Sequence, residues 1–296
     1  MFKLAGHTMG TPEYTVPEAL ELFRKIGLQG AEIIVQDDYR CAIPTDASME
    51  YLTQIRDCAQ KNEIVIIALT PYNSRYNDLD DDVRDAEIEA IRKTIGYARF
   101  LGAKYVRIYG GNFPAGTVDV DGKMRKRLVE ALRELGDMAW RQKVTLVVEN
   151  HFNTMAVSVA QTVSLLEEID HPAVGALYDQ VNLTFTLQEE FEQAIEMQKK
   201  LIRYVHVKDL VFKEGRRAFV SSDVSRPTEE ERNVTSKIVG EGITPWKAIL
   251  QRLRDIGYDG WLSFEYERRW HSQDLPDASI GMAACVRNLR KCFPGT

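Results

Sequence analysis

The sequence predicts a single α/β domain that closes as a (β/α)8 barrel, the TIM-barrel fold. Eight short apolar runs alternate with segments of helical periodicity, and the runs are not joined as adjacent hairpins, which favours parallel pairing. A glycine connector recurs after the expected helices, at Ile26-Gly27, Leu101-Gly102 and Ile256-Gly257. A doubly wound open sheet is the alternative, but the segment from Gly6 to Gly10 lacks the GxGxxG spacing of its phosphate-binding turn.

The first half of the chain supplies four of the expected strands, over residues 2–5, 31–35, 64–69 and 105–109. The third is apolar throughout, which is typical of a strand buried on both faces. Thr15 and Glu18 form a capping box that begins the first helix, and Gly27 ends it. The next helix is expected near residues 49–60. Another carries an apolar stripe at helical spacing, namely Ile88, Ile91, Ile95 and Ala98.

The second half supplies the other four expected strands, over residues 144–148, 174–179, 204–207 and 260–264. Helices are expected over residues 121–141, 157–169 and 187–201, from Thr244-Pro245 to Ile256, and at the end over about 278–292. The single domain therefore covers residues 1–296. A long irregular segment at about 210–243 follows the seventh strand, and segments of this length are often functional. We expect it to overhang the carboxyl end of the barrel.

Composition excludes several classes of partner. The chain carries 38 basic and 44 acidic side chains, a net charge of -6, so nucleic acid is not an expected partner. No apolar stretch approaches the roughly 20 residues that span a bilayer, and the first residues lack the pattern of a signal peptide. The four cysteines show no CxxC pairing and are expected to be reduced thiols. We therefore expect a cytoplasmic protein with no membrane partner.

Four residues that can bind a metal stand at the far ends of expected strands, namely Glu149, Asp179, His206 and Glu265. The carboxyl ends of parallel strands converge on one rim of a barrel, where an ion keeps part of its coordination shell open to substrate. Strand alternation places all four side chains on the barrel-facing side. Taken singly, each is also explained as a helix cap, a partner of an arginine or a hydrogen-bonded core histidine.

Taken together, the four residues predict a site for one divalent metal ion. Three carboxylates buried near one another without a cation would carry a heavy repulsive and desolvation cost. Three carboxylates and one imidazole suit an ion of intermediate hardness, Mn²⁺ or Co²⁺ first, with Mg²⁺ or Zn²⁺ as alternatives.

Several motifs along the chain resemble those of the xylose isomerase-like TIM barrels, the sugar phosphate isomerases and epimerases. They are the segments 148–151, 206–209, 239–242 and 257–265, read as Val-Glu-Asn-His, His-Val-Lys-Asp, Val-Gly-Glu-Gly and Gly-Tyr-Asp-Gly-Trp-Leu-Ser-Phe-Glu. The family includes ketose 3-epimerases, hydroxypyruvate isomerase, inosose and dehydroshikimate dehydratases, and apurinic endonucleases. In its epimerases, the positions matching Glu149 and Glu265 bind the metal and act as acid and base. The resemblance also implies a homo-oligomer, although no contact surface is evident in the sequence.

One position departs from the family pattern. Many members carry histidine three residues after the metal-binding Asp, whereas this chain has Asn182, which can bind a hydroxyl but cannot exchange a proton. The endonuclease branch needs that histidine and several more for its metal cluster. Together with the acidic charge, its absence argues against nuclease activity.

The chemistry expected of this site begins at a carbonyl. A metal that chelates the carbonyl oxygen and a neighbouring hydroxyl of a sugar or keto-polyol stabilises the enediolate formed when a carboxylate removes the adjacent proton. Glu149 and Glu265 are the candidate proton-transfer residues. Return of the proton gives an isomerase or epimerase, and loss of a β-hydroxyl gives a lyase or dehydratase on a keto-sugar or inosose. A non-catalytic subunit that binds metal or sugar is a further alternative.

Other residues near the expected rim are weaker candidates for substrate binding. Lys208 either holds a substrate oxygen or pairs with Asp209 in solvent. His151 either orients substrate or bonds a backbone carbonyl. His7 and Glu267 are further rim candidates, and Asn182 can bind a hydroxyl.

Charged residues elsewhere near the expected strands have further interpretations. Arg268 begins a basic and aromatic stretch with Trp270 that can form a wall for a polyol. Glu32 and Arg107 fall inside expected strands, where an interior ion pair is favoured over contact with substrate.

Overall fold

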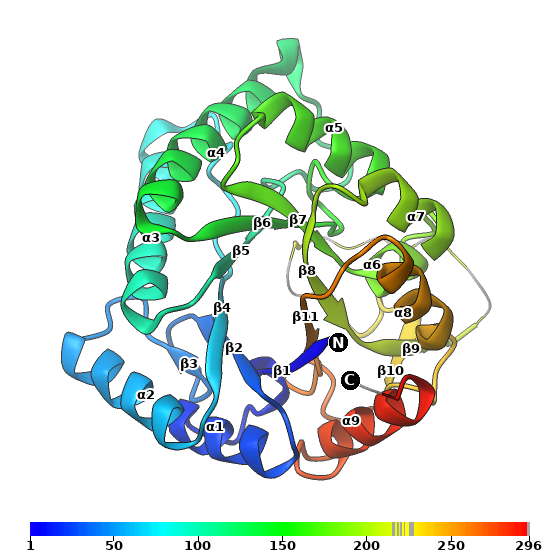
Figure 1. Ribbon diagram of the computed structural model, residues 1–296. Coiled ribbons are helices and arrows are strands. Elements are labelled where there is room, and N and C mark those ends of the chain that lie inside the picture. The colour runs from blue at the N-terminus through cyan, green and yellow to red at the C-terminus, as the bar shows by residue number, and fades with distance from the viewer. Residues whose placement is uncertain (215–216, 218, 220, 222, 225–227, 295–296) are drawn as a thin grey trace.

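The structure is a computed structural model that describes residues 1–214, 217, 219, 221, 223–224 and 228–294. Eight parallel strands are arranged in the order β1-β11-β8-β7-β6-β5-β4-β2, and the pairing of β1 with β2 closes them into a barrel. Figure 1 looks along the barrel, with the helices forming a ring outside the strands. The predicted (β/α)8 barrel is therefore confirmed.

The barrel strands lie close to the expected positions, with ends that differ by at most two residues. They are β1 Lys3–His7, β2 Gly30–Val35, β4 Val65–Pro71, β5 Tyr105–Tyr109, β6 Thr145–Glu149, β7 Val174–Tyr178, β8 Ile202–Val207 and β11 Trp261–Phe264. A short additional strand, β3 (Ala42–Ile43), pairs with the end of β2. Two residues carry too little periodicity for β3 to be predicted from the sequence.

The helices cover the outside of the barrel. They are α1 Val16–Lys25, α2 Met49–Lys61, α3 Asp81–Leu101, α4 Lys123–Gln142, α5 Val159–Ile169, α6 Gln180–Phe185, α7 Phe191–Gln198, α8 Trp246–Asp255 and α9 Gly281–Cys292. Two short 3-10 helices lie at Thr8–Gly10 and Val120–Gly122. The sequence did not predict α6, which has only six residues and follows β7 directly after Asp179.

Local signals at the helix ends act as the sequence predicts. Thr15 and Glu18 form the capping box of α1, with each side chain engaging the backbone of the other. Gly27, Gly102 and Gly257 all have positive φ, the left-handed conformation that favours glycine after a helix. The following residues then bond back to carbonyls five positions earlier, as Leu28, Ala103 and Tyr258 do. Thr244 differs from expectation, because α8 is capped at Pro245 without a side-chain hydrogen bond.

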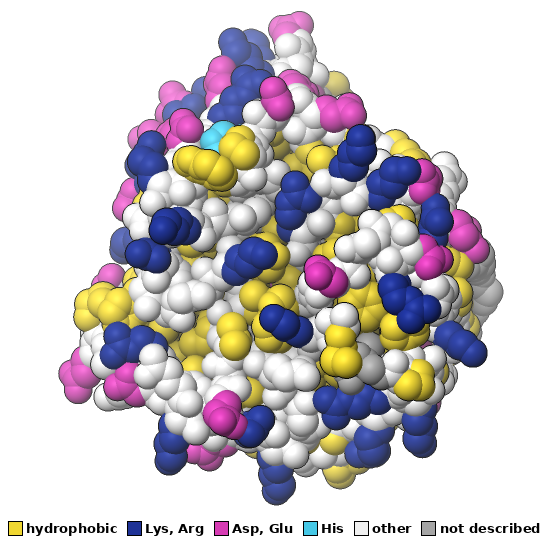
Figure 2. Space-filling view, in the orientation of Figure 1, with side chains coloured by type: hydrophobic (Ala, Val, Ile, Leu, Met, Phe, Trp, Pro, Cys, Tyr) yellow, Lys and Arg dark blue, Asp and Glu magenta, His cyan; other side chains and the backbone are white. Residues whose placement is uncertain are grey.

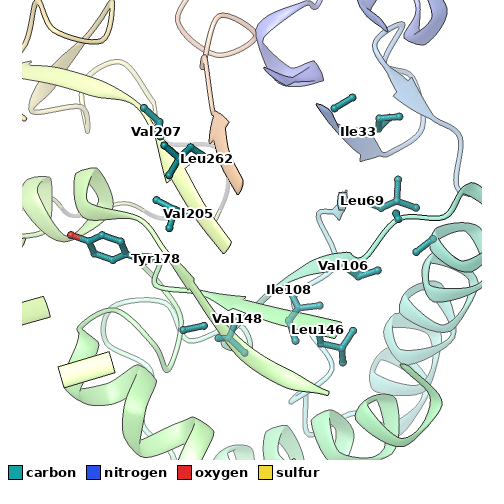
Figure 3. Close-up of a cluster of buried hydrophobic side chains, with 14 of the residues drawn as sticks. Ile33, Leu69, Val106, Ile108, Leu146, Val148, Tyr178, Val205, Val207 and Leu262 are labelled. Atoms are coloured by element: carbon teal, nitrogen blue, oxygen red, sulfur yellow. The ribbon is translucent and has the colours of Figure 1, made fainter. Parts of the chain in front are cut away.

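Two apolar layers surround the strands. One fills the barrel interior and includes Val147, Leu177 and Tyr204, each two residues before a predicted metal ligand. The other lies between the strands and the helices. Figure 3 shows part of this outer layer, to which neighbouring strands contribute Val106, Ile108, Leu146, Val148, Val205 and Leu262. Because side chains alternate along a strand, the inner set places the following polar residues inside the barrel mouth.

The segment after β8 is more regular than the sequence predicts. Within residues 210–243, expected to be irregular, β9 (Asp209–Phe212) pairs antiparallel with β10 (Val234–Lys237) as a separate two-stranded sheet. Each strand has only four residues, which is too short for a clear alternating pattern. Residues 215–216, 218, 220, 222 and 225–227 of this segment lie outside the described residues.

The surface carries charge of both signs. Figure 2, in the orientation of Figure 1, shows acidic and basic side chains mixed around the edge, with both hydrophobic and basic side chains near the barrel axis. Among the helices of the described part of the chain, none combines the length and apolar character required to cross a bilayer.

Candidate metal centre

The four predicted metal ligands come together at the carboxyl ends of consecutive strands. Glu149 is the last residue of β6, Asp179 directly follows β7, His206 is the next-to-last residue of β8, and Glu265 directly follows β11. Their ligand atoms all lie within 4.8 Å of one another. Each residue is at most 4% exposed, so their charges interact in a protein interior. The geometry that strand alternation predicts is therefore present.

The Nδ1 atom of His206 lies at the centre of this group. It is 3.3 Å from Glu149 Oε1, 3.3 Å from Glu265 Oε2 and 3.7 Å from Asp179 Oδ2. Adjacent ligands of one cation, each about 2.1 Å from it, lie roughly 3.0–3.4 Å apart. Among the described residues, His206 Nδ1 has no hydrogen-bond partner and is fully enclosed. Such an atom points to a ligand at this place.

Glu32 fixes the orientation of the His206 ring from the other side. Its two carboxylate oxygens lie 3.2 and 3.1 Å from His206 Nε2. Tyr204 donates a hydrogen bond to the same carboxylate over 3.0 Å, and Thr70 donates over 2.5 Å. A carboxylate that accepts the Nε2 proton leaves Nδ1 with a lone pair, the arrangement that commonly supports a metal-binding histidine.

The sequence had assigned Glu32 and Arg107 to an interior ion pair. Both do form buried ion pairs, but with other partners. Glu32 pairs with His206 and lies 3.5 Å from His7, whereas the Arg107 Nε atom lies 3.3 Å from Glu149 Oε2. Charged residues inside strands were the only signal for these contacts, and that signal did not specify the partner.

Glu149 is held between Arg107, His206 and Asn182. Asn182 donates a hydrogen bond to Glu149 Oε1 over 3.1 Å, and its backbone nitrogen donates to Asp179 over 2.9 Å. Burial and nearby Glu265 act to raise the pKa of Glu149, but Arg107 and His206 outweigh them, so its pKa lies below the usual value. Glu149 is therefore held as a carboxylate.

Lys208 contacts three carboxylates at and beside the candidate metal centre. Its Nζ atom lies 2.6 Å from Glu265 Oε2, 3.0 Å from Asp179 Oδ2 and 3.1 Å from Glu267 Oε1. Burial acts to raise the pKa of Glu265, but Lys208 and His206 outweigh it, and its pKa lies well below the usual value. Burial acts to lower the pKa of Lys208, but Asp179 and Glu265 hold it well above its usual value. Both groups are therefore charged.

The alternative that Lys208 pairs with Asp209 in solvent is wrong. Lys208 is only 6% exposed, and Asp209 is turned toward the backbone of the segment before α8. The Asp209 carboxylate accepts hydrogen bonds from the backbone nitrogens of four residues, namely Leu210, Gly240, Gly242 and Thr244. Lys208 and Asp209 therefore have different sets of partners.

The chemistry of the donor set fits a divalent cation. Five buried or partly buried carboxylates, those of Glu32, Glu149, Asp179, Glu265 and Glu267, face two permanent cations, Arg107 and Lys208. Burial acts to lower the pKa of His206, but the carboxylates of Glu265 and Glu32 raise it well above the usual value. The surrounding carboxylates therefore favour positive charge at this position. A metal bound at Nδ1 would displace the proton from that atom.

A cavity opens above this centre. Of the four candidate ligands only Glu265 lines it. Arg107 and Lys208, which contact Glu149 and Asp179, also line it. Four of the predicted substrate-binding residues are in the lining, namely His151, Asn182, Lys208 and Glu267. The His151 ring also contacts the Phe152 carbonyl through Nδ1 at 3.1 Å, so both predicted roles of His151 are compatible with its position.

Two predicted substrate-binding residues do not reach the cavity. His7 is fully buried beside Glu32, and its Nδ1 accepts a hydrogen bond from the backbone of Met9. Arg268 pairs with Glu13 at 2.7 Å and donates to the Leu275 carbonyl, outside the cavity lining. The expectation of a wall that includes Arg268 is corrected by this geometry, because only the later residues Trp270 and His271 of that stretch turn inward.

The cavity also contains residues that the sequence did not predict to line it. Arg107 and Arg232 contribute guanidinium groups, and Arg232 is itself paired with Glu229 and Asp274. An apolar group lines another part, namely Phe152, Val181, Phe185, Leu210, Phe219 and Val234. These residues are separated in sequence by up to 82 positions, from 152 to 234, and no periodic pattern connects them.

Comparison with known proteins agrees with the barrel fold described above. A model of the xylose isomerase-like TIM barrel family matches residues 20–288. An inosose dehydratase of Geobacillus thermodenitrificans is 28% identical over 149 residues, which cover 48% of this chain and 46% of that protein. The match thus spans about half the length of this relative.

Solved structures share the fold along the whole chain. A D-psicose 3-epimerase solved in the presence of D-fructose has a TM-score of 0.73 at 18% identity, covering 99% of this chain and 97% of the other. The IOLI protein with a bound zinc atom has a TM-score of 0.76 at 20% identity, covering 99% and 100%. At these identities the likeness establishes the fold.

Proposed function

The chain belongs to the xylose isomerase-like TIM barrel family, and from this premise we propose that it is a divalent-metal-dependent isomerase or epimerase. Its substrate would be a small sugar or keto-polyol, and the reaction would begin with removal of the proton next to the carbonyl. One observation carries the proposal. Two ionised glutamates, Glu149 and Glu265, approach the same atom, His206 Nδ1, from strands β6 and β11 on different sides of the barrel mouth.

The metal would be held by Glu149, Asp179, His206 and Glu265. When bound, a divalent cation polarises a substrate carbonyl and so makes the adjacent C–H bond more acidic. The donor set favours Mn²⁺ or Co²⁺, with Mg²⁺ or Zn²⁺ as alternatives. A cation among these carboxylates would compete with Lys208 for the oxygens of Asp179 and Glu265, which Lys208 contacts at 3.0 and 2.6 Å.

The side chains at and around the candidate metal centre have separate roles in the proposed reaction. One of Glu149 and Glu265 removes the proton as a carboxylate. For epimerisation the other, once it has taken up a proton from solvent, donates that proton to the opposite face of the same carbon; for isomerisation the first residue returns its proton to the neighbouring carbon. Lys208 lines the cavity and is positively charged, so it can stabilise negative charge that develops on a substrate oxygen. Asn182 holds Glu149 in place by its 3.1 Å hydrogen bond, and cannot itself transfer a proton.

A dehydratase is the second candidate. The inosose dehydratase relative supports it, and removal of the same proton precedes the loss of a β-hydroxyl as water. In this alternative one glutamate removes the proton as a carboxylate, and the second, once it has taken up a proton from solvent, donates that proton to the departing hydroxyl, which leaves as water.

The decisive experiment uses solvent deuterium. Protein loaded with Mn²⁺ is incubated in D₂O with ketoses, inososes and keto-sugars, the metal is removed, and each C–H position is followed by NMR. An isomerase or epimerase introduces deuterium at the reacting carbon and retains all hydroxyls, whereas a dehydratase forms a product that lacks one. Absence of both exchange and water loss across the panel would leave a non-catalytic binding protein.

A further inference from the structure

One wall of the cavity is formed by apolar rings. Phe219 packs edge-to-face against Phe152 and Phe185, with ring centroids 4.8 and 5.0 Å apart. The Phe152 and Phe185 rings are tilted relative to each other, with centroids 5.8 Å apart. Val181, Leu210 and Val234 extend this wall, and all six residues line the cavity. We call this group the phenylalanine wall.

A second apolar group lines the cavity from elsewhere in the barrel. It consists of Met9, Tyr72 and Trp270, and the Tyr72 and Trp270 rings meet at 82° with centroids 6.2 Å apart. These residues follow β1, β4 and β11, whereas the phenylalanine wall follows β6, β7 and β8. In the barrel order, the two groups therefore come from different arcs of the mouth.

This distribution does not suit a free monosaccharide alone. A sugar presents hydroxyls around its edge, and burying them against phenylalanine and leucine leaves them without hydrogen bonds, which costs free energy. One aromatic residue is enough to cover the apolar face of a sugar ring. The polar residues near the candidate metal centre can form hydrogen bonds with the hydroxyls of one sugar ring. The phenylalanine wall is then available to an apolar part of the ligand.

We infer that the substrate is a keto-sugar that carries a ring-sized apolar substituent, such as the glycoside of an aromatic alcohol. This inference rests on the proposed function for the sugar part of the ligand. The sugar lies beside Glu265, Lys208 and Glu267, and the substituent packs against Phe185 and its neighbours. Burying apolar surface on preformed rings then supplies selectivity for glycosides over free sugars.

Binding of two simple glycosides tests the inference. Isothermal titration calorimetry of Mn²⁺-loaded protein would compare phenyl β-D-glucopyranoside with methyl β-D-glucopyranoside. The phenyl glycoside should bind at least about tenfold more tightly, which corresponds to about 1.4 kcal/mol. Phe152→Ala and Phe185→Ala should each reduce that preference by about fivefold or more, since each removes one ring of the wall.

The matched control is Phe212→Ala. Phe212 packs against the same apolar cluster but does not line the cavity, so its loss should leave the preference for the phenyl glycoside in place. Phe185→Leu serves if the alanine variant does not fold, and it should retain part of the preference. Equal binding of both glycosides, no binding of the phenyl glycoside, or an equal loss of preference in Phe212→Ala would overturn the inference.

Failure of this inference and failure of the proposed function give different results. Deuterium exchange into free ketoses together with equal glycoside binding leaves the proposed function intact and rejects the apolar substituent. A phenyl preference that depends on Phe185, with no exchange or water loss in any keto-sugar, rejects the proposed chemistry and retains the ligand class.

Discussion

At the scale of single residues, Glu149 and Glu265 differ in the cation that keeps each one charged. Arg107 contacts Glu149, and Lys208 contacts Glu265. Arg107 is also stacked on Tyr109, with the guanidinium carbon 4.1 Å from the ring centroid, which fixes it in place. Lys208 has a flexible side chain and three carboxylate partners, so it can move when a cation or substrate binds.

Removal of either glutamate charge should stop proton transfer. We expect Glu149→Gln and Glu265→Gln each to lower the rate of solvent exchange by at least about 100-fold, because an amide cannot act as a base. The rate is measured by NMR in D₂O at saturating metal, with metal content determined separately. Glu50→Gln, at an exposed position of α2, is the control. Normal exchange in either variant would remove that residue from the proposed role.

Glu32 should control metal affinity through His206. In Glu32→Gln the amide can donate to Nε2 instead of accepting from it, which no longer favours the ring form with a lone pair on Nδ1. We expect the affinity for Mn²⁺ to fall about 10–100-fold, as is common when such a partner is lost. Competition with a chromophoric chelator measures it.

A neighbouring substitution provides the control for Glu32. Thr70→Val removes one hydrogen bond to the same carboxylate without changing its charge, and should change metal affinity much less. If Glu32→Gln binds metal as tightly as the unmodified protein, Nδ1 of His206 is not the ligand atom.

At the scale of elements, Asp209 joins the end of β8 to the segment that precedes α8. Its carboxylate accepts hydrogen bonds from four backbone N–H groups, those of Leu210, Gly240, Gly242 and Thr244. A Cβ on Gly242 would lie 2.2 Å from Asp209 Oδ1, so only glycine permits this approach. The motifs at residues 206–209 and 239–242 are therefore two halves of one structural unit.

Asp209→Asn should destabilise the fold. The amide replaces one acceptor oxygen by a donor that faces backbone N–H groups, so at least one buried donor loses its partner. We expect a loss of about 2–4 kcal/mol, given the strength of hydrogen bonds to charged groups. Urea unfolding measures the change, with Asp259→Asn at an exposed position as the control. A change below about 0.5 kcal/mol would show that this carboxylate does not hold the two segments together.

A glycine inside α3 and the glycine that caps its end offer a matched pair of substitutions. Gly102 has a φ of 75°, and no atom lies within 4 Å of an added Cβ, so Gly102→Ala tests backbone conformation alone. We expect a loss of about 1 kcal/mol. Gly96 lies inside the helix and also has open space around a Cβ, so Gly96→Ala should stabilise by about 0.5–1 kcal/mol. Thermal unfolding of both variants would show shifts of opposite sign, and shifts of the same sign would contradict this explanation.

At the scale of the whole molecule, metal binding should stabilise the barrel. The four candidate ligands come from β6, β7, β8 and β11, so one ion would link four strands that are distant in sequence. At a free Mn²⁺ concentration of about 100 times Kd, the stabilisation is about 2.7 kcal/mol. We expect chelation with EDTA to lower Tm and readdition of Mn²⁺ to restore it. The double variant Glu149→Gln, Glu265→Gln should lose this dependence, and an unchanged Tm in the unmodified protein would argue against the site.

Periodicity in the sequence determined the eight barrel strands, their parallel arrangement and the helices of more than six residues. It also placed Glu149, Asp179, His206 and Glu265 on one rim, because alternation along a strand is a local property that neighbouring residues reveal. The short elements β3, α6, β9 and β10 were not predicted, since two to six residues carry little periodic signal and tertiary packing decides their form.

The tertiary structure alone decided which charged and apolar residues meet. Arg107 with Glu149, Glu32 with His206, and Lys208 with Asp179 are contacts between different strands, whose partners depend on barrel closure and register. The phenylalanine wall likewise gathers rings from three separate connections at the barrel mouth. The sequence by itself therefore determined the barrel and the candidate metal ligands. Partners and cavity shape required the fold, because interactions between distant segments leave no repeating pattern along the chain.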